Sequence, residues 1–148
     1  MARIFLERRD SIAMDDDLKR VFERLRERTG DDALNAECTP PLDVIETAAA
    51  VEVVMDVPGV ALQDLSIVFV HHTLVIMGRK LPAGCDHREA AFHLAERTFG
   101  RFARAVRLAG AFDTGRVEAT LRAGELRLTL PRIAERRGAE LRIPVRAD

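Results

Sequence analysis

Residues 116–132, RVEATLRAGELRLTLPR, decide the fold class of this 148-residue chain. Apolar side chains alternate with polar ones along residues 117–121 and again along residues 126–130. A period of two puts every second side chain on the same face of a β-strand. Between the two runs, Ala123-Gly124 occupies the place of a tight turn. The stretch therefore predicts an antiparallel β-hairpin.

The same period of two appears upstream, in residues 49–60, AAVEVVMDVPGV. The apolar side chains fall on one face of the predicted strand, while Glu52 and Asp56 fall on the other. Pro58-Gly59 then favours a turn that ends the strand. The predicted apolar face consists of Val51, Val53, Met55 and Val57.

Residues 64–80, DLSIVFVHHTLVIMGRK, predict a second hairpin. Val68 and Val70 alternate with apolar neighbours, so the first strand is apolar on both faces. Such a strand is covered on two sides or requires a partner. Leu65, Ile67 and Phe69 share one face of the first strand; on the second strand that face continues through Leu74 and Ile76, or through Val75 and Met77.

Residues 90–108, AAFHLAERTFGRFARAVRL, give conflicting signals. Propensity alone favours a helix over residues 91–108, because Ala, Leu, Glu and Arg are good helix formers. Gly100 in the middle of the stretch and a weak apolar stripe count against a helix.

The N-terminal segment has a helical pattern instead. Asp15–Asp17 precede residues 18–30, LKRVFERLRERTG, which predict a helix with one apolar stripe. A helix this short requires a surface to pack on. Because Thr39-Pro40-Pro41 then breaks the chain, we expect three parts. They are an N-terminal arm, partly helical or disordered, at residues 1–40, a β-rich domain at residues 41–132 and a C-terminal extension at residues 133–148.

Composition indicates a globular protein, with 47% apolar and 32% charged residues. Trp and Tyr do not occur, so aromatic platforms for stacking bases are scarce. Apolar runs fall short of the roughly 18 residues of a membrane span, and acidic residues follow the N-terminus too closely for a signal peptide. Although a disulfide between Cys38 and Cys85 stays open, we interpret both as reduced thiols, which favours a cytoplasmic location.

The sequence motifs do not indicate a catalytic, cofactor or metal site. The sequence lacks a phosphate-binding glycine loop, and neither Ser11 nor Ser66 lies in a nucleophile motif. Adjacent histidines on a strand point to opposite faces, so we interpret the best metal candidates as surface side chains with an incidental thiol. Those candidates are His71, His72, Cys85, His87 and His93. We therefore expect no enzyme activity, no nucleotide and no cofactor.

Five motifs in collinear order resemble those of the bacterial and plant-type small heat-shock proteins, whose shared module is the α-crystallin domain. His71-His72 and Ala123 depart from the turn residues usual in that family. The motifs are PPLDVIETAAAVEVVMDVPGVALQDLSIVF at residues 40–69, LVIMGRK at 74–80, ERTFGRFARAVRL at 96–108, ATLRAGELRLTLPR at 119–132 and Ile143-Pro144-Val145.

The resemblance implies an all-β fold, an immunoglobulin-like antiparallel β-sandwich, in which Arg101–Arg107 is a strand and not a helix. In bacterial and plant-type members a strand on the preceding loop crosses to the neighbouring subunit and forms a swapped dimer. Here the ten residues from Lys80 to Glu89 reach about 33 Å when extended, which is enough for a swap. The swap strand would comprise Ala91, Phe92, His93, Leu94, Ala95, Glu96 and Arg97.

The resemblance also implies an ATP-independent holdase chaperone, which binds partly unfolded client proteins and prevents their aggregation as a reversible oligomer. Ile143, Pro144 and Val145 would plug a groove on another copy of the chain. The groove candidates are Val68, Val70, Val117, Ala119 and Leu121. Side chains of the arm would contact clients or pack the oligomer interior, and the candidates are Phe5, Leu6, Ile12, Leu18, Val21, Phe22 and Leu25.

Two other classes stay open. A CS-type co-chaperone module shares the sandwich but is usually monomeric, so a terminal apolar motif would have no role in it. A nucleic-acid-binding module would use residues 91–148, which hold 12 Arg against 7 acidic residues. It would lack a recognition helix and aromatic side chains, so nucleic acid is not an expected partner.

Overall fold

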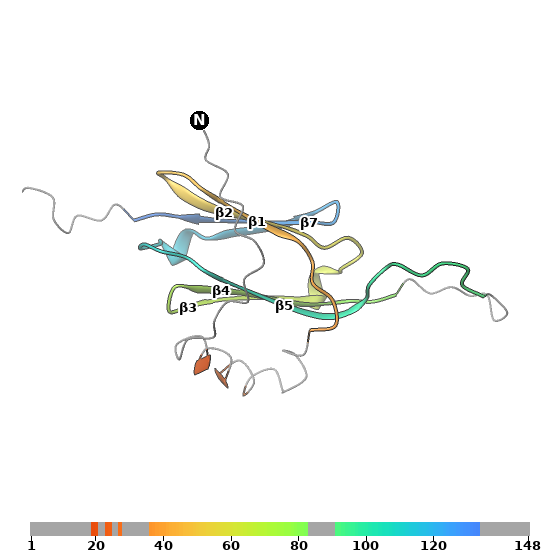
Figure 1. The fold of residues 1–148 in the computed structure, drawn as a ribbon. Helices are drawn as coiled ribbons and strands as arrows, with labels where there is room; N and C mark the ends of the chain where they lie inside the picture. Colours follow the sequence, from red (N-terminus) through yellow and green to blue (C-terminus); the bar gives the residue numbers. More distant parts are fainter. Residues whose placement is uncertain (1–18, 21–22, 25–26, 28–35, 83–90, 134–148) are drawn as a thin grey trace, which may run out of the picture. The chain divides into compact units, whose positions relative to one another are not determined.

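The computed structural model describes residues 19–20, 23–24, 27, 36–82 and 91–133 (Figure 1). Within these residues, seven strands form two antiparallel sheets, which confirms the expected all-β class. The chain divides into two compact units, and each contains one sheet. One unit comprises residues 1–39 and 59–108, and the other comprises residues 40–58 and 109–148.

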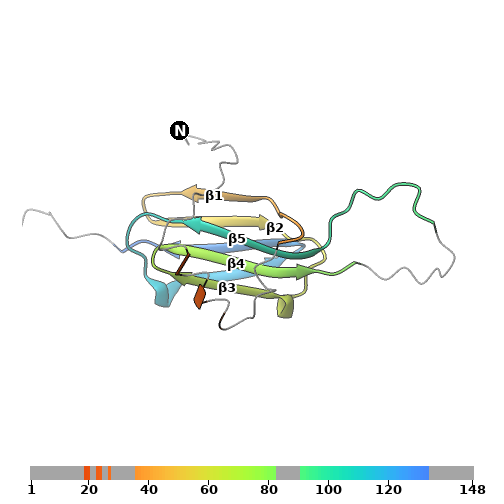
Figure 2. The ribbon, with the colours of Figure 1, turned by 60° about the horizontal axis from the view of Figure 1, so that its bottom comes forward.

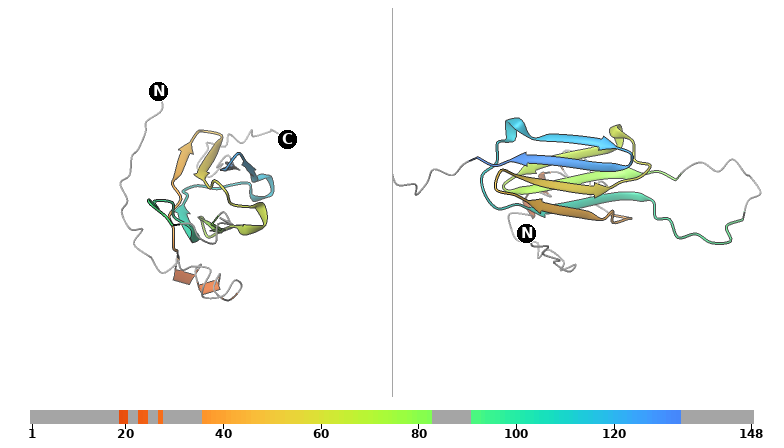
Figure 3. Two further views of the ribbon diagram at one scale, coloured as in Figure 1. Left: turned by 90° about the vertical axis from the view of Figure 1, so that its right-hand side faces the viewer. Right: turned by 90° about the horizontal axis from the view of Figure 1, so that it is seen from above.

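The four-stranded sheet has the strand order β1-β2-β7-β6 (Figure 3). Val53 on β2 lies opposite Leu128 on β7, and neither side chain is exposed to solvent. The apolar face predicted for β2 and the predicted β6–β7 hairpin are therefore confirmed. The strands are β1 (Leu42–Glu46), β2 (Ala50–Asp56), β6 (Glu118–Arg122) and β7 (Glu125–Pro131). The same face also buries Val51, Met55, Leu126 and Leu130.

The opposite face of this sheet is polar. The Arg127 guanidinium donates hydrogen bonds to Glu52 at 2.9 Å and to Glu125 at 3.0 Å. The hydrogen bond to Glu125 is the main cause that raises the pKa of Arg127, so the group stays charged. Because all three side chains are partly exposed, these ion pairs make the face soluble more than they stabilise it.

The turn between β6 and β7 requires left-handed backbone at both residues, with φ 50° at Ala123 and 79° at Gly124. A Cβ at Gly124 would lie 2.8 Å from the Cα of Pro58, so this position has room only for glycine. The carbonyl of Gly124 accepts a hydrogen bond from the Val57 N–H at 2.7 Å. No comparable constraint selects alanine at position 123, where the Cβ makes the left-handed backbone unfavourable by about 1–2 kcal/mol.

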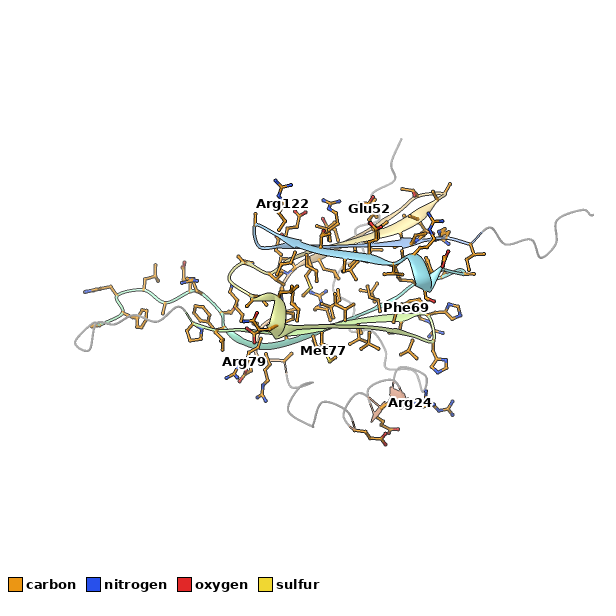
Figure 4. All side chains as sticks on the ribbon, turned by 180° about the vertical axis from the view of Figure 1, so that it is seen from behind. Arg24, Glu52, Phe69, Met77, Arg79 and Arg122 are labelled. Carbon is orange, nitrogen blue, oxygen red and sulfur yellow. The ribbon has the colours of Figure 1, made fainter. Side chains whose placement is uncertain are left out.

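The three-stranded sheet has the strand order β3-β4-β5 (Figure 2). The first alternative for the second strand is confirmed, because Leu74 and Ile76 lie opposite Phe69 and Ile67, while Val75 and Met77 lie on the other face, which β4 also buries. Leu74 lies opposite Phe69 on one face, and Val75 lies opposite Val68 on the other. Figure 4 shows Phe69 and Met77 on opposite sides of this sheet. The strands are β3 (Leu65–Val70), β4 (Thr73–Lys80) and β5 (Gly100–Arg107).

The helix that propensity alone favours over residues 91–108 is wrong. β5 pairs with β4 along its whole length, from Gly100 opposite Lys80 to Arg107 opposite Thr73. Helix propensity is a weak preference, and the gain from this pairing and from burial of Phe102 outweighs it. The strand implied by the family resemblance is therefore confirmed.

Short segments complete the described chain. The described residues include two 3-10 helices, η2 (Leu62–Asp64) before β3 and η3 (Thr114–Arg116) before β6. The described arm residues are helical and exposed, in agreement with the predicted helix: Lys19, Arg20, Glu23, Arg24 and Glu27. The following predicted residues lie outside the described part of the chain: Phe5, Leu6, Ile12, Leu18, Val21, Phe22, Leu25, Cys85, His87, Ile143, Pro144 and Val145.

Candidate functional site

The histidines do not form a metal site in the described part of the chain, where no three His, Cys, Asp or Glu side chains converge. His71 and His72 form the β3–β4 turn, and both are exposed with left-handed φ of 47° and 62°. His93 is exposed on the connector between β4 and β5. Among the helices described, none combines the length and the apolar character needed to cross a bilayer. The candidate site is therefore sought on surfaces and strand edges.

The connector that leads into β5 exposes large apolar side chains. Residues 91–98 are all exposed and belong to no strand in the single chain. Phe92 is 84% exposed and Leu94 is 73% exposed. Two large apolar side chains exposed at alternate positions form a small apolar surface. Such a surface favours pairing with another segment or protein. This segment is the predicted swap strand, residues 91–97.

The end of the connector is fixed to the sheet by Phe99. The Arg97 guanidinium lies 4.9 Å from the Phe99 ring centroid, and the Lys80 ammonium lies 5.7 Å from it. Cations at these distances are attracted to the ring face. The two cations come from opposite ends of the connector, so the aromatic ring holds these ends together where they join β4 and β5.

The edge strand β1 is a second accessible surface. In the sheet order it has a neighbour on one side only, β2. Val44 and Ile45 on β1 are each nearly half exposed. An edge strand presents unpaired backbone N–H and C=O groups, which another extended segment can bind. β1 therefore offers unpaired backbone groups and apolar side chains to an added strand.

The groove candidates on β6 lie on the apolar face of the four-stranded sheet. Ala119 lies opposite the buried Leu128, and Leu121 lies opposite the buried Leu126. Ala119 is exposed and Leu121 is half-buried. Val117, just before the strand, is half-buried as well. β6 is an edge strand, so these side chains lie at the margin of the sheet.

The groove candidates on β3 lie on a face that the sequence did not assign. Val68 and Val70 pack against Val75 and Met77, on the face that points away from Phe69. The β3 side chains of the other face, which include Ile67 and Phe69, are half-buried too and were not predicted as groove residues. The two-residue turn at His71-His72 sets Phe69 opposite Leu74, so counting back from this turn would have separated the two faces.

The residues that precede the β-domain are bound to the outer edge of β5. The N–H groups of Glu37 and Cys38 both donate to the Arg101 carbonyl, at 2.7 and 3.1 Å. In return, the Arg101 N–H donates to the Glu37 carboxylate at 2.8 Å. This backbone hydrogen bond is the main cause that lowers the pKa of Glu37. Burial raises the pKa of the Cys38 thiol, whose sulfur lies 3.6 Å from the Gly100 carbonyl oxygen.

Known proteins are similar to this chain in sequence. The model of the Hsp20/alpha crystallin family matches residues 43–146. The 21.9 kDa heat shock protein of Oryza sativa subsp. japonica is 36% identical over 106 residues, which cover 66% of this chain and 52% of the rice protein. The 18 kDa heat shock protein of Streptomyces albus G is 33% identical over 118 residues, 79% of this chain and 81% of that protein. This chain thus matches about half the length of the rice protein.

A solved structure gives the same result for the fold. The small heat-shock protein of Xylella fastidiosa has a TM-score of 0.62 and 25% identity, with 76% of this chain and 100% of that chain covered. Its description reports a distinct high order structure for that protein. The likeness confirms the α-crystallin domain expected from the sequence.

The two antiparallel sheets, with their accessible strand edges and exposed apolar connector, form a domain of the α-crystallin type. The chain belongs to the Hsp20/alpha crystallin family, because the family model covers well over half of it. This confirms the resemblance carried by the five motifs. Membership supports a chaperone role in the stress response.

Proposed function

We propose that this protein is an ATP-independent holdase, which binds partly unfolded proteins and prevents their aggregation while it works as a reversible oligomer of swapped dimers. The observation that carries the proposal is the exposure of Phe92 and Leu94 in a chain that also offers an edge strand, β1. Unfolding clients expose apolar surface, and a holdase must offer matching surface without precipitating. No nucleotide, cofactor or catalytic group takes part, and the cytoplasm is the proposed location.

The dimer forms when residues 91–97 of one copy pair with β1 of the other. The connector supplies two apolar side chains and a free backbone, and β1 supplies an open edge. Phe92→Ser with Leu94→Ser should turn dimers into monomers in light scattering after size exclusion. His93→Ser with Ala95→Ser is the matched control, since it changes the alternate face of the same segment. Equal dimer content in both variants would contradict the swap.

Larger assemblies form through the tail motif. Burying Ile143 and Val145 contributes about 3–6 kcal/mol before ordering costs, which offset much of it. Each contact is therefore weak and reversible, while many contacts in one assembly hold it together. Pro144 reduces the ordering cost because it keeps the motif extended. The edge strands β3 and β6 of another copy, with the candidate residues Val68, Val70, Val117, Ala119 and Leu121, are the proposed receptor.

Removal of the plug tests this step. Ile143→Ala with Val145→Ala should leave mostly dimers by light scattering, while Arg142→Ala with Arg146→Ala, which flanks the motif, should preserve the large oligomer. An unchanged oligomer after the first pair of substitutions would refute the plug assignment. A wild-type chain that is monomeric would favour the CS-type alternative.

The chaperone activity itself is tested by light scattering of a heat-aggregating client. At equimolar subunits and without ATP, we expect this protein to suppress the rise in scattering. Addition of ATP should make no difference, because the proposed holdase binds no nucleotide. A scattering curve that matches the client alone would contradict the holdase function.

A further inference from the structure

The connector between β4 and β5 is held at its base by one aromatic ring and bends at the next residue. The Phe99 ring centroid lies 4.9 Å from the Arg97 guanidinium and 5.7 Å from the Lys80 ammonium. Gly100, the first residue of β5, has a left-handed φ of 103°. A β-strand has negative φ, so the chain changes direction sharply where it enters the sheet.

The bend at Gly100 is fixed by its surroundings. A side chain at this position would place its Cβ 2.7 Å from the Cβ of Glu37, so the space favours glycine as strongly as the backbone does. The residue after the bend is bound as well, because the Arg101 N–H donates to the Glu37 carboxylate at 2.8 Å. The direction in which the connector leaves the sheet is therefore defined at Gly100.

The Phe99 ring joins two segments that are distant in the sequence. Lys80 is the last residue of β4 and lies opposite Gly100 in the register of β4 and β5. Arg97 is the last residue of the proposed swap strand. The negative face of an aromatic ring attracts a nearby cation, so both side chains are drawn to the same ring. The end of the swap strand is thereby tied to the sheet.

A tie at this end matters because the segment has no strand structure of its own. Residues 91–98 are exposed and form no strand in the single chain. A segment that becomes ordered only on binding loses conformational entropy at that step, which weakens the binding. With Arg97 held on the ring, the last residue of the swap strand is already positioned before a partner subunit binds. Less entropy is then lost when the strand pairs.

We propose that Phe99 is a positioning residue for the strand swap. Its contacts with Arg97 and Lys80, hereafter the Phe99 clamp, hold the end of residues 91–97 in place before that segment pairs with β1 of the partner subunit. The ring acts on the dimer through the connector of its own chain and raises the affinity between the subunits. This inference rests on the swapped dimer of the proposed function and names the residues that preorganise it.

The dissociation constant of the dimer tests the clamp. Native mass spectrometry of the full-length chain across a dilution series measures it, with Ile143→Ala and Val145→Ala in every protein to limit larger assemblies. Phe99→Leu keeps an apolar side chain but removes both cation contacts, so it should raise the dissociation constant about fivefold. Phe99→Tyr keeps the aromatic ring and should leave the constant at the wild-type value.

The cations of β4 supply a matched pair of variants. Lys80→Met removes the charge and keeps the length of the side chain, so it should raise the dissociation constant about twofold. Beside Phe99→Leu the same change should have no further effect. Arg79→Met, which removes the adjacent cation on the opposite side of the strand, should leave the constant unchanged. A Phe99→Leu dimer as tight as wild type overturns the proposal, and so does a Phe99→Tyr dimer as weak as Phe99→Leu.

Tryptic cleavage after Arg97 measures the clamp within one chain and separates its failure from failure of the swap. In the Phe92→Ser, Leu94→Ser variant, added Phe99→Leu should speed this cleavage several-fold, because a guanidinium held on the ring is less available to the protease. Cleavage after Arg122, which is exposed in the four-stranded sheet, is the internal reference and should not change. Equal rates after Arg97, or a parallel rise after Arg122, overturn the clamp. A double-serine variant that stays dimeric contradicts the swap instead.

Discussion

The two sheets of this protein use their faces differently. The four-stranded sheet buries one face and covers the other with charge, as the Glu52–Arg127 pair shows. The three-stranded sheet is apolar on both faces, and β4 alone buries Leu74 on one side and Val75 on the other. An antiparallel sheet with one solvated face requires a cover on its other face only, whereas a sheet with two apolar faces requires a cover on both. The surplus apolar surface of the molecule therefore lies on the three-stranded sheet.

The largest effect is expected from Leu128→Ala at the centre of the four-stranded sheet. Leu128 is 0% exposed, and loss of a buried leucine side chain usually lowers the free energy of unfolding by about 2–5 kcal/mol. Urea unfolding at fixed protein concentration measures this loss. A loss below 1 kcal/mol would show that this face is less tightly packed than its burial indicates.

A matched pair of valines compares the sheets directly. Val53 on the four-stranded sheet and Val75 on the second face of the three-stranded sheet are both 0% exposed. Each Val→Ala change should lower the free energy of unfolding by about 1.6 kcal/mol, from two buried methylene equivalents, plus a cavity term. A much smaller loss for Val75→Ala in the same urea titration would show that the second face is solvated and would break the comparison.

The hairpin turns of the two sheets share one strained feature, non-glycine residues with positive φ. Ala123→Asn in the four-stranded sheet should raise the free energy of unfolding by about 1 kcal/mol, because Asn tolerates the left-handed region better than Ala. Ala111→Asn, at an exposed residue without positive φ, should give no gain. Thermal unfolding of both variants checks the difference, and equal melting temperatures would contradict it.

The smallest effect concerns the hydrogen bond between the Arg101 N–H on β5 and the Glu37 carboxylate. The Arg101 N–H lowers the pKa of Glu37 below its ordinary value of 4.5, so the carboxylate stabilises the fold above that pH. This contribution is lost as the pH falls through the lowered folded pKa. Glu37→Gln should therefore be slightly less stable than wild type at pH 7, and the gap in urea midpoints should close in acid. A gap that is constant with pH would refute the interpretation.

The sequence predicted the parts of the fold in which a single period dominates. Val51, Val53 and Met55 fall on one face and Glu52 and Asp56 on the other, so one buried face could be assigned without a structure. Residues 100–107 could not be assigned by propensity, because Ala and Arg favour a helix, while β5 forms through its pairing with β4 and the burial of Phe102. Local preference carries no information about a partner strand.

The sequence predicted which strands carry the candidate site, but it did not assign all of their side chains to one face or the other. Since both faces of β3 are apolar, alternation alone cannot tell Val68 from Ile67. The position of the turn at His71-His72 assigns Val68 and Ile67 to opposite faces. The two histidines have left-handed backbone, but a pair of histidines is not a typical turn sequence. The exposure of Phe92 and the anchor at Glu37 depend on tertiary structure, which no local pattern encodes.

The central claim is that this chain holds unfolding proteins in soluble form. The most direct measurement is size exclusion of a heat-sensitive client that has been heated with this protein in the absence of nucleotide. We expect client and chaperone to elute together as one large soluble complex. Client found only in the pellet, with this protein alone in solution, would contradict the claim.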